Sequence, residues 1–416
     1  MRRAMTPHAR PWLRHLVALL GIAVALPAYA GEDLRLDQVI LIYRHGVRSP
    51  LPGEIQVDEV HGKPWPTWSV APSILTQHGR EGVMAMGRYD RAWMSDAGLF
   101  PKDDCPANGS VAVWANTDQR TIASGQAYAD AFAPGCTLAV GHLPEGATDP
   151  LFNPVAAGAV TWDGKTALST IRHETGGPDV LTASRRDAMM RFAQVMGCTN
   201  GDVQAVCRPA TWKGTLTLAD DGKGIALGGP IAITSGTAEA IIMAWLEGMP
   251  LENVGWGRVD ATTFRALSQL HSLLFDIHAR PSYVGAHVAA VLGNRIATLI
   301  DDPAAPRLNV FVGSDNNIVA LASVLGVHFD MPGYGKDDPP VGGALVITVW
   351  RSADKLHRYV RVAYQAQTPD QLRELRALSV AQPPARQSLV PKACLTTPAR
   401  CDVGTVLEVL HRLPRP

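Results

Sequence analysis

The sequence lacks a surplus of charge of either sign. Its 416 residues include 38 Lys and Arg against 38 Asp and Glu, so the formal net charge at pH 7 is zero. Proteins that bind nucleic acid usually show a basic excess or a basic stripe, so this balance argues against that class. The hydrophobic fraction of 46% excludes a chain that is disordered throughout, because such chains have too few apolar residues to form a core.

Long apolar runs are also missing after the first thirty residues, and a membrane span needs about 20 apolar residues. Within those thirty, Arg2 and Arg3 precede a short apolar stretch, 16–26, which is followed by Ala28-Tyr29-Ala30. This pattern is typical of a secretory signal peptide. We therefore expect residues 1–30 to be removed and the mature protein to lie in the periplasm, without membrane contact. Its 34 basic and 38 acidic residues would then give a net charge of −4.

The six cysteines fall into three pairs of sequence neighbours. An even count in an exported chain suggests disulfides, although six cysteines allow fifteen pairings. We predict bridges within the local pairs, Cys105–Cys136, Cys198–Cys207 and Cys394–Cys401. The sequence has no Cys-x2-Cys motif and no Cys/His cluster, so we expect no metal site.

Three predicted strands each run directly into a polar loop. The strands are 37–43, 111–115 and 308–312, and the loops that follow are 44–50, 116–120 and 313–317. Ligands bind at the carboxyl ends of strands in open α/β sheets, so the three loops are candidates for one shared site. Helices are expected at 79–94, 120–131, 183–196, 237–247, 262–277, 286–300, 317–325 and 369–378, with an antiparallel pair at 344–350 and 358–364.

These elements predict an α/β fold with a mainly parallel central sheet flanked by helices. Residues 31–150 and 286–416 would form this core, because they contain the strand-plus-loop patterns. Residues 151–285 hold no such pattern and are expected to form a mainly helical insertion domain. The Pro-rich stretch 381–391 is expected to be a surface loop.

The segment Arg-His-Gly-Val-Arg-Ser-Pro at 44–50 carries the clearest chemistry. Arg44 and Arg48 offer planar forks of donors that match phosphate oxygens. His45 between them can attack phosphorus and form a phosphohistidine that water hydrolyses. We expect its other ring nitrogen to donate to a backbone carbonyl, and Gly46 to leave room for a ligand. The alternative is a buried, hydrogen-bonded histidine beside surface arginines.

This segment resembles the Arg-His-Gly-x-Arg-x-Pro signature of the histidine acid phosphatases, branch 2 of the histidine phosphatase superfamily. The likeness is greatest to bacterial periplasmic phytases and glucose-1-phosphatases, and it covers nearly the whole mature chain. The three cysteine pairs also sit where that group has disulfides, while a fourth bridge of the group is absent. The further segments that resemble this group are 65–68, 118–121, 149–154, 255–258 and 339–343.

The resemblance implies a phosphoglycerate-mutase-like fold and a role for each matching residue. His45 would be the nucleophile, and Asp315 would donate a proton to the leaving alcohol. Arg44, Arg48 and Arg120 would clamp the phosphate and stabilise charge in the transition state. Without the resemblance, Arg120 reads as a solvated arginine at a helix start. The chemistry needs no metal or other cofactor, because the arginines supply the positive charge.

The third loop departs from the family pattern, which has His-Asp where this chain has Ser314-Asp315. A serine can give the phosphate one hydrogen bond but no charge. Losing or weakening such a contact would lower the rate about tenfold to a hundredfold. We therefore expect a working enzyme with altered activity, and a catalytically weak phosphate-ester-binding protein is the alternative.

The expected partner is a small-molecule phosphate monoester, such as phytate or a sugar phosphate, hydrolysed at acidic pH by a monomer. A phosphotransferase resembling phosphoglycerate mutase is a third hypothesis, which the signal peptide and the disulfides disfavour. The histidines at 271, 278 and 287 lack a metal-ligand spacing, so we expect them to be structural or exposed.

Overall fold

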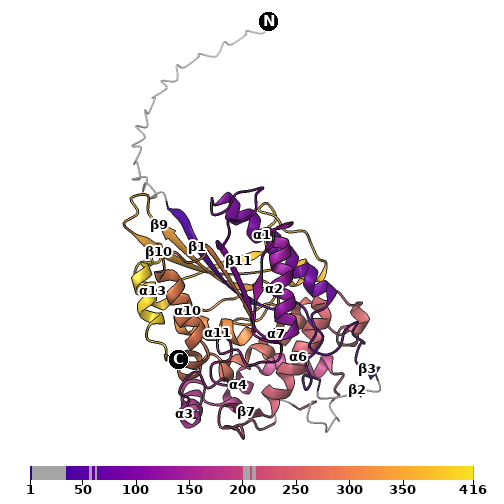
Figure 1. Ribbon diagram of the computed structural model, residues 1–416. Coiled ribbons are helices and arrows are strands. Elements are labelled where there is room, and N and C mark those ends of the chain that lie inside the picture. The colour runs from indigo at the N-terminus through magenta and orange to yellow at the C-terminus, as the bar shows by residue number, and fades with distance from the viewer. Residues whose placement is uncertain (2–33, 56–58, 61–62, 200–206, 209–211, 416) are drawn as a thin grey trace.

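The computed structural model describes residues 1, 34–55, 59–60, 63–199, 207–208 and 212–415 (Figure 1). Apart from Met1, the predicted signal peptide lies outside these residues. All three predicted disulfides are confirmed, since Cys105–Cys136, Cys198–Cys207 and Cys394–Cys401 are bonded. In the described ranges no single helix is long and apolar enough to cross a membrane. The pair Ser282–Val288 and Ala290–Asp301, bent by 61°, meets that test only when taken together.

A seven-stranded sheet forms the centre of the described chain, with strand order β11-β10-β9-β1-β8-β4-β5. Its strands are β1 (Arg35–Arg44), β4 (Val111–Ala115), β5 (Val140–Gly141), β8 (Leu308–Gly313), β9 (Ala344–Arg351), β10 (Arg358–Ala366) and β11 (Ala385–Leu389). The three strands predicted to run into polar loops are therefore confirmed as β1, β4 and β8. They lie side by side and parallel, in the order β1-β8-β4.

The register of these strands aligns the three polar loops. Arg44 of β1 pairs with Gly313 of β8, and Ala115 of β4 pairs with Val312 of β8. The carboxyl ends of all three strands therefore lie side by side. This alignment is what brings segments more than 250 residues apart in the chain to one place.

The sheet is less parallel than predicted. Three of its strand pairings are parallel and three are antiparallel, because β9, β10 and β11 follow one another as antiparallel neighbours. A short turn joins β9 to β10, and such a turn permits only an antiparallel pair. The expectation of a loop over 381–391 is also wrong, since β11 lies there at the edge of the sheet. Proline is tolerated at that edge, and Pro384 directly precedes the strand.

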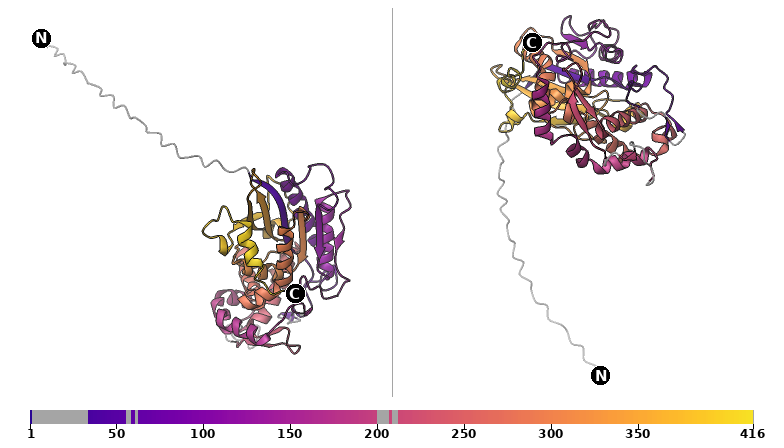
Figure 2. Two further views of the ribbon diagram at one scale, coloured as in Figure 1. Left: turned by 60° about the vertical axis from the view of Figure 1, so that its left-hand side comes forward. Right: turned by 90° about the horizontal axis from the view of Figure 1, so that it is seen from below.

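Helices cover both faces of the sheet, as the alternation along β1 requires. Val39, Leu41 and Tyr43 face a core formed with α1 (Gln77–Asp96) and α2 (Gln119–Phe132). Ile40 and Ile42 face the opposite core, which contains residues of α6 (Pro230–Leu246), α7 (Ala261–Ser272), α10 (Ala290–Asp301), α11 (Asp315–Leu325) and α13 (Val403–Leu410). Figure 2 shows α1 and α2, coloured purple, on one side of the sheet and the orange and yellow helices on the other.

The predicted helices exist, with breaks at three places, and the helix expected over 369–378 ends at Arg373. The pattern over 183–196 corresponds to two helices that meet at Arg185, and those over 262–277 and 286–300 are also each divided in two. The remaining helices are α3 (Gly164–Thr175), α4 (Pro178–Ser184), α5 (Arg186–Val195), α6 (Pro230–Leu246), α7 (Ala261–Ser272), α8 (Phe275–His278), α9 (Ser282–Val288), α10 (Ala290–Asp301), α11 (Asp315–Leu325), α12 (Pro369–Arg373) and α13 (Val403–Leu410), with 3-10 turns η3 (Leu251–Asn253), η4 (Gly255–Gly257) and η5 (Lys392–Cys394).

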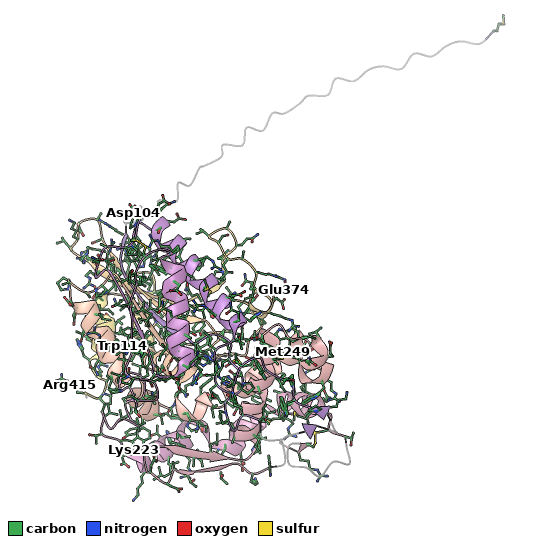
Figure 3. All side chains as sticks on the ribbon, turned by 45° about the vertical axis from the view of Figure 1, so that its right-hand side comes forward. Asp104, Trp114, Lys223, Met249, Glu374 and Arg415 are labelled. Carbon is green, nitrogen blue, oxygen red and sulfur yellow. A yellow bond between two sulfur atoms is a disulfide. The ribbon has the colours of Figure 1, made fainter. Side chains whose placement is uncertain are left out.

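The chain between β5 and β8 is mainly helical in the residues that the structure describes. It adds one hairpin, β6 (Thr215–Leu218) with β7 (Ile225–Gly228), while a second small hairpin, β2 (Glu59–Val60) with β3 (Lys63–Pro64), follows the 44–50 loop. Lys223, between β6 and β7, lies at the far end of the molecule from Asp104 (Figure 3). The division into a core and an insertion domain stays a prediction, and the two parts share one hydrophobic core.

Candidate active site

The loops after β1, β4 and β8 meet at the carboxyl ends of these three strands, and hydrogen bonds hold the loops in place. The His45 backbone N–H donates to the Gly313 carbonyl at 3.2 Å, and the Gly46 N–H donates to Ser124 Oγ at 3.0 Å. Across the site, Arg44 Nη2 lies 2.9 Å from Asp315 Oδ2. The structure therefore brings together the residues to which the sequence assigned the phosphate chemistry.

His45 is buried and held in a single tautomer. Its Nδ1 lies 2.8 Å from the carbonyl oxygen of Gly46, and a carbonyl can only accept, so Nδ1 carries the hydrogen. The predicted orientation is thus confirmed, and Nε2 keeps a lone pair. Burial lowers the pKa of His45 well below its ordinary value, and the charges of the three arginines, Arg120 foremost, lower it further. The imidazole is therefore neutral even in mildly acidic solution.

The reason for glycine at position 46 differs from the one expected. A Cβ there would lie 2.7 Å from the carbonyl oxygen of Gly79 and 2.9 Å from a methyl group of Val83. The space is taken by the start of α1, not by a ligand. A Cβ on Gly79 would in turn lie 2.1 Å from the carbonyl oxygen of Val47. Two glycines thus let α1 pack directly against the loop that carries His45.

Arg44 is almost fully buried and tied to both flanks of the site. Its Nη1 donates to the Pro339 carbonyl at 2.7 Å, and its Nη2 contacts the carboxylates of Glu239 and Asp315. Burial alone would lower the pKa of Arg44, but these two carboxylates outweigh it and raise that pKa. The guanidinium is therefore a permanent charge whose orientation is set on several sides.

Arg48 and Arg120 each have a carboxylate partner of their own. Glu54 accepts from both ends of the Arg48 fork, at 2.9 and 2.6 Å. Asp118 Oδ2 accepts from Arg120 Nη2 at 3.1 Å. Asp118 belongs to a segment that resembles the phosphatase family, whereas nothing in the sequence pointed to Glu54. A phosphate that binds Arg48 has to compete with the Glu54 carboxylate.

A buried ionic network behind Arg44 was missed by the sequence analysis. Glu239 Oε1 accepts from Arg44, and Glu239 Oε2 lies 3.6 Å from His271 Nδ1. His271 Nδ1 also lies 2.7 Å from Asp338 Oδ1, and Ser268 donates to the other oxygen of Asp338. One signal was available, because Glu239 is the only charged residue of helix α6, which is otherwise mostly apolar. A carboxylate in such a helix needs a cationic partner.

The pKa values in this network follow from its charges. Burial alone would lower the pKa of His271, but Glu239 and Asp338 raise it to about 9. Burial alone would raise the pKa of Glu239, but Arg44, followed by His271, lowers it to about 2. At pH 7 the imidazolium therefore lies between two carboxylates. Of the two expected states, structural or exposed, His271 has the first: it is buried and charged, and it supports the site from behind Arg44.

Ser314 and Asp315 start α11 at the end of β8. The Ser314 backbone N–H and hydroxyl both donate to Asn317 Oδ1, at 3.0 and 3.1 Å, in a capping arrangement. Asn317 Nδ2 donates to the Phe152 carbonyl at 2.8 Å and so ties this turn to the 152–156 loop. The hydroxyl hydrogen that a contact from Ser314 to phosphate would need is directed at Asn317. That contact stays a prediction.

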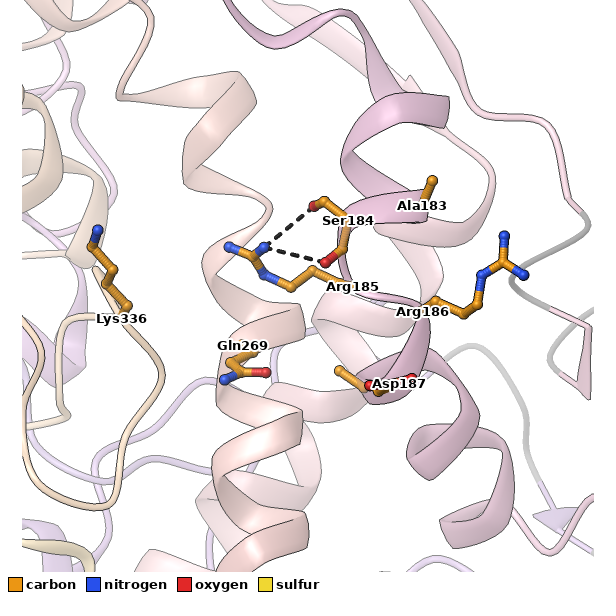
Figure 4. Close-up of a pocket in the computed structure, with 8 residues that line it drawn as sticks. Ala183, Ser184, Arg185, Arg186, Asp187, Gln269 and Lys336 are labelled. Carbon is orange, nitrogen blue, oxygen red and sulfur yellow. Dashed lines mark hydrogen bonds between the residues drawn. The ribbon is translucent and has the colours of Figure 1, made fainter.

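One cavity is lined by the neighbours of Asp315 in the chain. This cavity, of about 240 Å³, is lined by Ser314 and Asn316, which flank Asp315 on either side. A larger one, of about 560 Å³, lies between α5, Gln269 of α7 and Lys336, and none of the predicted site residues lines it. Figure 4 shows Arg185 and Lys336 on opposite sides of that larger cavity. Ser314 is the one predicted site residue in the lining of the smaller cavity, so the predicted catalytic residues lie outside that lining.

Known proteins resemble this chain along most of its length. A family model described as histidine phosphatase superfamily (branch 2) matches residues 35–216. Phytase AppA of Escherichia coli (strain K12) is 29% identical, over 96% of this chain and 98% of the relative. A glucose-1-phosphatase of Providencia rettgeri is 28% identical, over 87% of this chain and 88% of the relative.

Solved structures show the same fold. Hafnia alvei phytase in complex with myo-inositol hexakis sulphate superposes with a TM-score of 0.84 at 28% identity, over 92% of this chain and 98% of that chain. The phytase from Citrobacter braakii gives a TM-score of 0.83 at 27% identity, over 92% of this chain and 98% of that chain.

Proposed function

Because this chain belongs to the histidine phosphatase superfamily (branch 2), and is a phosphomonoesterase, we propose that it acts through a phosphohistidine formed on His45. The observation that carries this proposal is the state of His45 itself. Its Nδ1 hydrogen is held by the Gly46 carbonyl, and its pKa is lowered by burial and by three arginines. Nε2 therefore has a free lone pair at a site of strong positive charge.

In the first step, Nε2 of His45 attacks phosphorus and the bond from phosphorus to the ester oxygen breaks. Asp315 gives a proton to that oxygen, so that an alcohol leaves and not an alkoxide. In the second step, water attacks the phosphohistidine, and Asp315 takes a proton from the water. The P–N bond breaks, inorganic phosphate forms, and both residues return to their starting states.

The three arginines stabilise the charge that the phosphoryl oxygens carry during both steps. Arg44 is already oriented by Glu239 and by the Pro339 carbonyl, so little reorganisation is needed when the substrate binds. Arg48 and Arg120 would exchange their contacts with Glu54 and Asp118 for contacts with the phosphate. Ser314 completes the proposed set as a weaker, uncharged donor.

Phytate or a sugar phosphate such as glucose 1-phosphate is the proposed substrate, at acidic pH and in the periplasm. The names of the relatives support these substrate classes. The low pKa of His45 supports acidic conditions, because the nucleophile stays neutral as the pH falls. The three disulfides fit an oxidising compartment outside the cytoplasm.

Hydrolysis of p-nitrophenyl phosphate between about pH 3 and 7, together with a panel containing phytate and glucose 1-phosphate, tests this proposal. We expect turnover that His45→Ala abolishes, and a phosphorylated enzyme trapped by acid quenching. The second candidate, a binding protein without turnover, is favoured by the Ser314 hydroxyl, which is engaged with Asn317. Measurable affinity for the esters without any turnover would decide for that candidate.

A further inference from the structure

A cavity of about 320 Å³ opens on one face of β4 and β8, and no predicted site residue lines it. The register places Ala112 opposite Asn309 and Trp114 opposite Phe311. Alternate residues of a strand share a face, so these four side chains form one patch. Ala112 is exposed, and its methyl group covers little of the sheet. The small side chain therefore leaves a hollow between its larger neighbours.

Asn309 contributes a buried carboxamide to the lining of this cavity. The residue is only 2% exposed, and its Nδ2 donates to the Pro306 carbonyl at 2.8 Å. Its Oδ1 accepts no hydrogen bond from any residue that the structure describes. A buried acceptor without a donor is destabilising, so a ligand that brings a hydroxyl or an N–H is favoured here.

Arg295 of α10 adds a cation to the lining. Its side chain is exposed and makes no ion pair within the described part of the chain. The one carboxylate in the lining is Asp149, and its two oxygens already accept from the Trp114 indole N–H and the Leu151 backbone N–H, both at 2.9 Å. Asp149 therefore holds the indole in place, while the Arg295 guanidinium is left for an anion.

The lining points to a flat, partly apolar anion as the ligand. Trp114 and Phe311 present aromatic surface, and Leu151 adds an aliphatic side chain. Aromatic rings pack well against such side chains, whereas an inorganic anion would leave them without an apolar partner. The volume also falls in the range of small-molecule sites, about 300–1,000 Å³.

We propose that this cavity binds a small aromatic acid that carries a ring hydroxyl or amine, at a site separate from the catalytic one. The carboxylate pairs with Arg295, the ring packs on Trp114, and the hydroxyl or amine donates to Asn309 Oδ1. The inference goes beyond the proposed function and does not depend on it, because binding of the acid requires no turnover.

Titration calorimetry of the full chain with 4-hydroxybenzoate tests this inference. We expect saturable binding of one acid per chain. Benzoate, which lacks the hydroxyl, should bind about fivefold more weakly, and phenol, which lacks the carboxylate, about tenfold more weakly. Equal Kd values for all three compounds would show adventitious binding to apolar surface and would overturn the inference, as would an absence of saturable binding.

Two variants locate the bound acid. Arg295→Gln should raise Kd about tenfold by removing the cation, and Ala112→Trp should abolish binding by filling the hollow. Both positions are exposed, so we expect both variants to fold and to hydrolyse p-nitrophenyl phosphate like the wild type.

Two further arginine variants are the matched controls. Arg186→Gln, on the exposed side of α5 in the larger cavity, and Arg120→Gln, in the catalytic site, should both leave Kd unchanged. Weaker binding in Arg120→Gln with an unchanged Kd in Arg295→Gln would place the acid in the catalytic site and overturn the inference. If the wild type binds the acid but does not turn over p-nitrophenyl phosphate, the proposed function fails and this inference stands.

Discussion

Arg44 and Asp315 form an ion pair of 2.9 Å that joins the end of β1 to the start of α11. The pair places the proposed proton donor against one of the arginines that would hold the phosphate. Since the same Nη2 of Arg44 also contacts Glu239, the position of Asp315 is coupled to the network inside the protein. A change in the buried charges around Glu239 should therefore affect the proposed proton donor through Arg44.

Asp315→Asn should remove proton donation while keeping the shape of the side chain. We expect kcat to fall about 10²- to 10⁴-fold with alkyl esters, the range that general acids contribute. The loss should be much smaller with p-nitrophenyl phosphate, whose leaving group needs no proton. Steady-state kinetics with both esters measure this difference, and an equal loss with both would show that Asp315 is not the acid.

Arg120→Gln should raise the pKa of His45, because the Arg120 charge is the largest of those that lower it. A higher pKa means that the nucleophile becomes protonated at a higher pH as the solution is acidified. The acidic limb of the kcat/KM profile should therefore move to higher pH, in addition to a higher KM. The control is Arg80→Gln, whose side chain pairs with Asp130 on the surface. If the acidic limb of the kcat/KM profile stays at the same pH in Arg120→Gln, that limb does not report the protonation of His45.

His271→Leu should destabilise the protein by about 3–5 kcal/mol at pH 7, because it removes the imidazolium that lies between Asp338 and Glu239 and leaves Glu239 with its arginine partner only. His271 has a folded-state pKa of about 9, raised from 6.5. Its stabilising contribution is therefore fully present below about pH 6.5 and is lost as the pH rises through 9. Urea unfolding at pH 6 and pH 10 should show the difference from wild type shrinking at the higher pH. A difference in the free energy of unfolding that is the same at both pH values would mean that His271 acts by packing alone.

Glu54→Gln should tighten phosphate binding. The Glu54 carboxylate occupies both Nη atoms of Arg48 and repels an approaching dianion. Removing about 1 kcal/mol of competition corresponds to a KM about fivefold lower for p-nitrophenyl phosphate. Glu81→Gln, an exposed residue of α1, serves as the control. If KM rises instead, Glu54 serves chiefly to orient Arg48.

Ser314→His should raise kcat with p-nitrophenyl phosphate, up to about tenfold, by adding a stronger donor beside the phosphate. Ser314 also caps α11, and the loss of a helix cap typically costs about 1 kcal/mol. We therefore expect faster turnover with a lower Tm. An unchanged or lower kcat in the folded variant would mean that the serine site is already adapted.

Much of the fold and the site was predictable from local patterns. The strand 111–115 was predicted with its observed bounds, and the cysteines pair with their sequence neighbours. The arginines and histidine at 44–50 could be recognised because residue types, spacing and a preceding buried strand all lie within one short segment. Such features depend on neighbouring residues, which the sequence shows directly.

Tertiary structure decided the rest, because those features depend on which surfaces pack together. Glu239 reaches Arg44 across 195 residues, and no local pattern shows that α6 presents its one carboxylate to the end of β1. The same holds for His278, which lines the cavity beside Ser314 from another helix. The basic and acidic residues of the whole sequence balance in number, but in the folded protein the charges are unevenly distributed. The chain itself determined which charged groups are present, and folding decided which of them are buried together, where the lower dielectric strengthens their interaction.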